Sequence, residues 1–415
     1  MRSELGLEEA GHEKTHQGSR IQLATSQIGE VLGGNKRLWT MVLVLIVVCL
    51  FFNLVTGGVF LSPRNLWNLA VQTSVVAIIS TGMVLVIVSR NIDLSVGSLE
   101  AFLGMFGGYL QTVILPLDGP YTWWITILTL LAFGFVSGFA QGAMSAYFLI
   151  PSFVVTLGGL MFWRAAGWLF THARTITPLD SKYHFFGEGS IGVFWSWILG
   201  AILIVLLASI ALWRRSSRKK LGFELRPLWI EIGIIGLWAI VVIAGVATMN
   251  AYTYPKSDIG RGIPVPVVIL LVVVLSMTYL ATMTRFGRYI YGYGGNPEAA
   301  ELAGVPTRRI IAISFGINGL LTAIGAIIST ARLNATPLTI GELLELQAIA
   351  ACVIGGASLS GGVGTVTGAI LGALLIQTLQ NGMLLLGVES SPQQIVMAGV
   401  LLAAVWLDVM VQRRR

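Results

Sequence analysis

The residues that could do chemistry are few, and they lie inside long apolar segments. Glu100 and Arg164 are the two best cases of charged side chains within such segments. A charge there costs about 2.5–3.5 kcal/mol on insertion scales and tends to face the interior of a helix bundle. The two either pair with each other or reach separately toward a membrane interface. No nucleophile stands with a histidine and a carboxylate in a recognisable arrangement, so we expect no catalytic residues and no cofactor.

Metal and disulfide chemistry are disfavoured in the same way. Cys49 and Cys352 both lie in apolar stretches, and the four histidines have no HExxH spacing and no cysteine partners. Neither a thiolate metal set nor a disulfide framework fits this pattern. We therefore expect no metal site.

The composition indicates that lipid surrounds most of the chain. Of its 415 residues, 55% are hydrophobic and only 11% are charged, whereas soluble domains carry about 25% charged residues. The net charge of +7 comes from short basic clusters between apolar blocks. Such clusters set the topology of a membrane protein, and no basic face with interleaved aromatic residues indicates a nucleic-acid partner.

The apolar blocks predict an all-α polytopic membrane protein of ten to twelve transmembrane helices, because about 20 apolar residues span a bilayer. Two of the segments, 343–357 and 365–387, flank the glycine-rich run GGASLSGGVGT (355–365) and are either full spans or a broken pair. The clear candidates are 38–60, 66–89, 96–115, 122–149, 153–172, 191–213, 228–250, 264–284, 310–331 and 393–411. Glycines at every fourth position, such as Gly134, Gly138 and Gly142, predict close helix packing.

The chain divides into a membrane domain, residues 38–411, with a polar segment at each end. Residues 1–37 form a tail that is either a helix on the membrane surface or largely without structure, and residues 412–415 are basic. Placing most of the 26 Lys and Arg residues on one side puts both termini in the cytoplasm. Residues 214–250 indicate an added hairpin.

The loop 285–309 predicts a short helix with a function of its own. Asn296 can cap it, Pro297 suits the first helical position, and Glu298 favours the positive end of the helix dipole. A small apolar face then suits a groove on another protein; the alternative is a self-contained connector. The residues expected to form this surface are Gly295, Asn296, Pro297, Glu298, Ala299, Ala300, Leu302 and Gly304.

Three stretches make the chain similar to a known family. They are SRNIDLSVGSL (89–99), GYGGNPEAAELAGVPTRRI (292–310), and ELQAIAACVIGGASLSGGVGTVTGAILGALL (345–375) followed by NGMLLLG (381–387). Together they resemble the permeases of bacterial ATP-binding-cassette (ABC) importers for ribose, xylose and galactose. The length, the added hairpin and TLGGLMFWRAAGWLFT (156–171) look most like the xylose-type permeases.

The resemblance implies a non-enzymatic permease of the bacterial inner membrane, with both termini cytoplasmic. The 294–304 helix would be the coupling helix that docks on a separate ABC ATPase. A periplasmic sugar-binding protein would deliver the substrate, and a second permease copy would complete a central pathway. The sequence agrees that ATP binds elsewhere, because none of the six lysines follows a glycine, as a GxxxxGK[ST] loop requires.

Candidates for the pathway or its gate are polar groups near breaks in the helices. Asp93 and Ser95 either contact sugar or, more simply, cap a buried turn. Ser358 and Ser360 lie in the glycine-rich run, where irregular backbone at membrane depth requires a protein or water-filled environment. Gln347, Gln377, Gln380 and Asn381 either line the path of an uncharged sugar or join neighbouring helices.

Three other functional classes compete with this interpretation. A self-sufficient secondary transporter predicts functional acids deep in several spans, and Glu100 is the only clear one. A membrane enzyme predicts clustered histidines and carboxylates at one membrane face. A scaffold protein leaves the ordered 294–304 helix unexplained.

Overall fold

The computed structural model describes residues 36–222 and 228–413. The chain forms two units, Met1–Val47 and Val48–Arg415. The predictions for the tail 1–37 fall almost wholly outside the described residues, as do those for Arg414 and Arg415. The packing below concerns the second unit.

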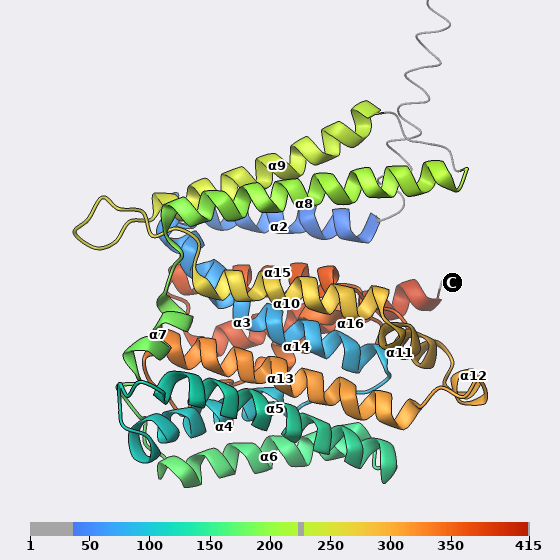
Figure 1. The fold of residues 1–415 in the computed structure, drawn as a ribbon, viewed down its shortest axis with the longest axis horizontal. Coiled ribbons are helices and arrows are strands. Elements are labelled where there is room, and N and C mark those ends of the chain that lie inside the picture. The colour runs from blue at the N-terminus through green and yellow to red at the C-terminus, as the bar shows by residue number, and fades with distance from the viewer. Residues whose placement is uncertain (1–35, 223–227, 414–415) are drawn as a thin grey trace, which may run out of the picture. The chain divides into compact units, whose positions relative to one another are not determined.

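The described residues are helical, and their only β-type pairings are three isolated bridges. The helices succeed one another along the chain without large intervening domains (Figure 1). They are α2 (Lys36–Val55), α3 (Pro63–Val88), α4 (Val96–Tyr109) with the π-helical η1 (Leu110–Ile114), α5 (Thr122–Tyr147), α6 (Ser152–Thr171), α7 (Ser181–Glu188), α8 (Gly192–Lys220), α9 (Leu228–Ala251), α10 (Val265–Met283), α11 (Arg285–Gly295), α12 (Pro297–Leu302), α13 (Thr307–Leu333), α14 (Leu344–Ile354), α15 (Val366–Leu385) and α16 (Ser390–Arg413).

Nine helices in the described part of the chain are long and apolar enough to cross a membrane. Helix α4, continued by η1, and helix α16 are further helices of the described chain, and the predicted number of ten to twelve spans stays a prediction. For residues 343–387 the structure has an unequal pair. Helix α14 has 11 residues and is too short to span alone, whereas α15 has 20.

Helices α3 and α13 form the core, and every residue of α3 from Val76 to Val88 is buried. Helix α13 packs most extensively against α5 and next against α3. The α5 seam depends on glycine: a Cβ at Gly138 would collide with the backbone of Phe315, and one at Gly134 with the backbone of Gly319. The predicted close packing at these glycines is confirmed, because backbones can approach this closely only where side chains are absent.

Helices α8 and α9 form an antiparallel hairpin that contacts the core lightly, through α9 and α3. Most of their side chains are exposed although both helices are strongly apolar, which suits a surface in contact with lipid. Arg215 and Glu231 join the two helices through a 2.8 Å ion pair. The hairpin formed by α8 and α9 begins at Gly192, whereas the sequence indicated a hairpin from residue 214.

Two sets of loops mark the opposite ends of the core helices. At the α7 end, the amide of Thr336 donates to the carbonyl of Ile176, and the Tyr183 hydroxyl lies 2.9 Å from that of Thr330. At the α12 end, residues 89–95 and 355–365 lie beside α11. The segment 334–343 runs from the α7 end into the bundle and leads into α14.

Candidate functional site

A polar cavity of about 410 Å³ lies among α3, α4, α13, α14, α15 and α16. Its size is within the range of small-molecule sites, about 300–1,000 Å³. None of the 18 residues that line it is aromatic. Its polar lining consists of Gln72, Glu100, Ser329, Arg332, Thr339, Glu342, Gln347, Gln377, Gln380, Asn381 and Gln393.

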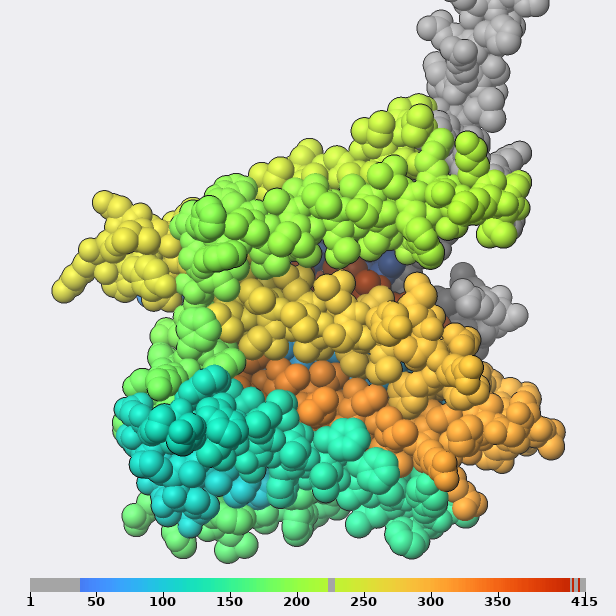
Figure 2. Space-filling model, in the orientation of Figure 1, coloured from blue at the N-terminus to red at the C-terminus, as the bar shows by residue number. Residues whose placement is uncertain are grey.

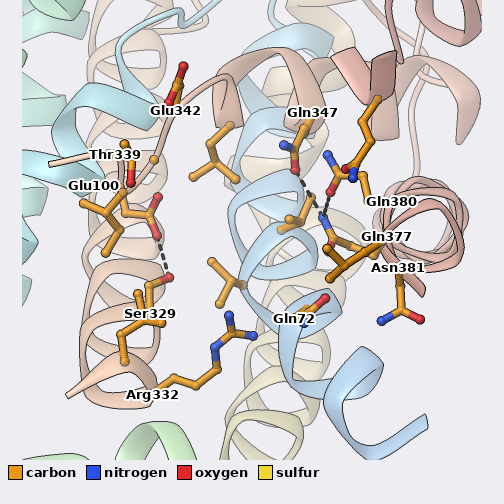
Figure 3. A pocket seen from close by; sticks show the side chains of 18 residues that line it. Gln72, Glu100, Ser329, Arg332, Thr339, Glu342, Gln347, Gln377, Gln380 and Asn381 are labelled. Carbon is orange, nitrogen blue, oxygen red and sulfur yellow. Dashed lines mark hydrogen bonds between the residues drawn. The ribbon is translucent and has the colours of Figure 1, made fainter. Parts of the chain in front are cut away.

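One wall of the cavity is made of neutral amides (Figure 3). The Gln377 Nε2 donates to Gln347 Oε1 at 3.2 Å and to Gln380 Oε1 at 2.8 Å. Asn381 Oδ1 accepts from Asn65 Nδ2 at 2.9 Å. The predicted residues Gln347, Gln377 and Asn381 therefore come together, and they both join helices and line the cavity.

The opposite wall carries charge. The hydroxyl of Ser329, on α13, donates to Glu100 Oε1, on α4, at 2.7 Å. Figure 3 shows Arg332 extending into the space between this pair and the amide wall. A guanidinium and a carboxylate bind hydroxyl groups well, since one supplies donors and the other acceptors.

Arg164 acts from outside the cavity. Its Nη1 donates to the carbonyl of Ile340 at 2.9 Å and to that of Leu338 at 3.3 Å. Arg164 and Glu100 thus hydrogen-bond to different groups, instead of pairing directly as one sequence alternative had it. Arg164 holds the 338–340 backbone, which forms part of the cavity wall.

Asp93 and Ser95 form a buried turn away from the cavity lining. Asp93 Oδ1 accepts from the Ser95 amide at 2.9 Å and from its hydroxyl at 2.7 Å, and Oδ2 accepts from Asn318 Nδ2 at 2.9 Å. The buried turn of the simpler sequence alternative occurs, but Asp93 does not cap α4: the N-cap residue is Ser95, and no side chain accepts a capping hydrogen bond there. Asp93 also fastens the start of α4 to the middle of α13.

The glycine-rich run 355–365 lies at the α12 end, beside α11. The hydroxyls of Ser358 and Ser360 are 2.7 Å apart, and neither residue lines the cavity. The Tyr291 hydroxyl donates to the carbonyl of Gly364 at 2.8 Å. Burial raises the pKa of the Tyr291 hydroxyl above its ordinary value.

The short helix α12 has the predicted local structure. Asn296 is its N-cap, with Oδ1 accepting from the Ala299 amide at 3.1 Å, and Pro297 occupies the first turn. Gly304 follows with a φ of +74°. Leu302 is 90% exposed, and the α12 region protrudes at the right edge of Figure 2. An exposed leucine on a protruding, capped helix suits contact with another protein.

The sequence analysis missed Gln72 and Ser329 in the cavity, Asn318 beside Asp93, and Arg90 beside α11. The available signal was a lone polar residue in an otherwise apolar helix, which in lipid needs a partner. In residues 36–222 and 228–413, no three His, Cys, Asp or Glu side chains are grouped to hold a metal ion.

Comparison with known proteins gives consistent matches. The family model described as "Branched-chain amino acid transport system / permease component" matches residues 65–228 and 231–405. The xylose transport system permease protein XylH of Haemophilus influenzae is 38% identical over 90% of this chain and 96% of its own length. XylH of Escherichia coli is 38% identical over 95% and 98%, and the ribose import permease protein RbsC of Escherichia coli is 32% identical over 84% and 87%. No solved structure matches the chain.

Proposed function

Because this chain belongs to the family of the permease components of branched-chain amino acid transport systems, we propose that it is the permease subunit of an ATP-driven importer for a neutral monosaccharide. The likeness to XylH over nearly the whole chain favours xylose or a related pentose or hexose. The likeness to RbsC supports the same substrate class.

The observation that carries this proposal is the lining of the cavity. Amide groups such as those of Gln347, Gln377 and Asn381 both donate and accept hydrogen bonds, which matches the hydroxyl groups of a sugar. The cavity has no aromatic lining residue, and thus no stacking surface to hold a sugar tightly. Weak, polar contacts suit a substrate that must enter and leave.

ATP hydrolysis in a partner subunit would be coupled to transport through α12. We assign α12 as the coupling helix, with Leu302 as the apolar contact to an ABC ATPase. A periplasmic sugar-binding protein would dock at the α7 end, and a second copy of the permease would complete the transporter. This places the chain in the bacterial inner membrane with both termini and α12 in the cytoplasm, as the distribution of basic residues favours.

Transport with the full set of partners tests the substrate. The permease, its ATPase and its binding protein are reconstituted in liposomes, and uptake of labelled xylose, ribose and leucine is measured with and without ATP. We expect ATP-dependent uptake of xylose or ribose. Uptake of leucine alone would overturn the substrate class, and ATP-independent sugar uptake would make the chain a secondary transporter.

Docking at α12 is tested by Leu302→Asp. We expect the ATPase to stop co-purifying with this variant, because a carboxylate would be desolvated in an apolar groove. Leu221→Asp is the matched control: Leu221 is 72% exposed at the end of α8, and its replacement should leave co-purification unchanged. Equal co-purification of both variants with the ATPase would refute the assignment of α12.

A further inference from the structure

Arg90 occupies a backbone position that rarely holds an arginine. It follows α3 with a φ of +61°, its amide donates to the carbonyl of Ile87, and the Asn91 amide donates to that of Val86. Glycine usually fills this place at the end of a helix, because a side chain there is strained. A strained non-glycine residue points to a role for its side chain.

The Arg90 side chain reaches the end of α11. Its Nε donates to the carbonyl of Gly294 at 2.8 Å, and its Nη2 donates to that of Gly295 at 3.1 Å. The last carbonyls of a helix lack partners within the helix and carry partial negative charge. The guanidinium therefore fixes the end of α11 directly before α12 begins.

Glycine contacts reinforce this junction. A Cβ at Gly294 would collide with the carbonyl oxygen of Val88 and the amide of Gly362, and a Cβ at Gly361 would collide with the Arg90 side chain. The Gly362 amide also donates to the carbonyl of Val88 at 2.9 Å. Three backbone segments thus touch without intervening side chains.

These segments continue into helices that line the cavity farther along their length. Val88 is the last residue of α3, which carries Gln72, and residues 355–365 connect α14, with Gln347, to α15, with Gln377. A displacement of α12 would therefore move the helices that form the amide wall. Because closely packed backbones do not deform smoothly, such a contact transmits motion.

We infer that Arg90, packed in this glycine junction (Gly294, Gly361 and Gly362), is a positioning residue that transmits movement of α12 to the helices of the cavity. This inference rests on the proposed function, since it assigns a route by which ATP hydrolysis in a partner changes the sugar site. It identifies Arg90 as necessary for coupling but not for docking of the ATPase.

Arg90→Gly separates the structural role from coupling. Glycine relieves the strain at the positive φ but removes both hydrogen bonds to α11. Because these two effects oppose each other, we expect only a small change in melting temperature. In liposomes with the ATPase and loaded binding protein, we expect sugar transported per ATP hydrolysed to fall at least about tenfold, because both hydrogen bonds from the guanidinium to the end of α11 are lost. Arg90→Lys, which keeps the charge but cannot donate to both carbonyls in the same geometry, should recover part of the ratio.

A glycine pair supplies the second test. Gly294→Ala forces the junction apart, whereas Gly292→Ala, two residues earlier in α11, meets open space. Gly294→Ala should lower the transport ratio while Gly292→Ala keeps it, with equal ATPase co-purification in both.

The possible outcomes are distinct. If Arg90→Gly transports as much sugar per ATP hydrolysed as the wild type, the inference is overturned. Loss of ATPase co-purification would also overturn it, since Arg90 would then shape the docking surface. If the wild-type complex itself shows no sugar-stimulated ATP hydrolysis, the proposed function fails before the junction is tested.

Discussion

The α5–α13 seam and the cavity wall formed by α14 and α15 hold their helices together in different ways. At the seam, Gly134 and Gly138 bring two helix backbones into contact. At the cavity, the hydrogen bond from Gln377 to Gln347 joins α15 to α14, and a second one from Gln377 to Gln380 lies within α15. Small residues give close packing, whereas amide bonds can be exchanged for bonds to a ligand. We therefore call the α5–α13 seam the scaffold. We call the amide wall the responsive wall, since its hydrogen bonds can change when a sugar binds.

The largest expected effect comes from a substitution that disrupts the α5–α13 seam. Gly138→Leu places a large side chain against the backbone of Phe315, and overpacking of a core costs about 1–3 kcal/mol and occasionally more. We expect little folded protein in size-exclusion chromatography of detergent extracts. Gly158→Leu, on α6 where a Cβ meets open space, should behave like the wild type. A folded Gly138→Leu protein would show that the seam tolerates separation.

The next effect concerns the turn that joins α4 to α13. Asp93→Ala removes the acceptor for Ser95 and Asn318, and each buried donor left unsatisfied costs about 1–3 kcal/mol. The melting temperature should fall clearly, and Asp93→Asn, which keeps one acceptor oxygen, should fall less. Normal stability with impaired uptake in Asp93→Ala would instead favour direct contact with sugar.

The amide wall should show the reverse pattern, with function lost and the fold retained. Gln377→Leu removes the donor to Gln347 and Gln380 in favour of an apolar group of similar size. We expect sugar uptake to fall about tenfold, equivalent to about 1.4 kcal/mol, with little change in melting temperature. Thr378→Val, the next residue along α15 and outside the cavity lining, is the control. Equal uptake by both variants would contradict a pathway at this wall.

The sequence predicted the local structures better than the long-range ones. The cap at Asn296, the proline at the first helical position and the end at Gly304 depend on neighbouring residues, and all three occur. The cavity depends on tertiary packing: Gln72 and Ser329 come from helices far apart in the chain, so no local pattern pairs them.

The partners of Arg164 and Glu100 were unpredictable for a related reason. A charge inside an apolar helix indicates that the residue needs a partner, but it does not identify that partner. Ser329 meets Glu100 because α4 packs on α13. Arg164 meets backbone carbonyls because residues 334–343 run into the bundle, where Leu343 has a φ of +57° at the start of α14.

The smallest expected effect tests whether the backbone held by Arg164 belongs with the scaffold or with the responsive wall. Arg164→Met removes the donors to Leu338 and Ile340 while keeping the apolar stem, and it should destabilise the protein by about 1 kcal/mol. If the segment belongs with the responsive wall, uptake should fall more than this loss of stability explains, because Thr339, Gly341 and Glu342 line the cavity. A variant with a lower melting temperature and unchanged uptake would assign the segment to the scaffold. Arg164→Lys, which keeps the charge and one donor direction, should lie between the wild type and Arg164→Met in both measurements.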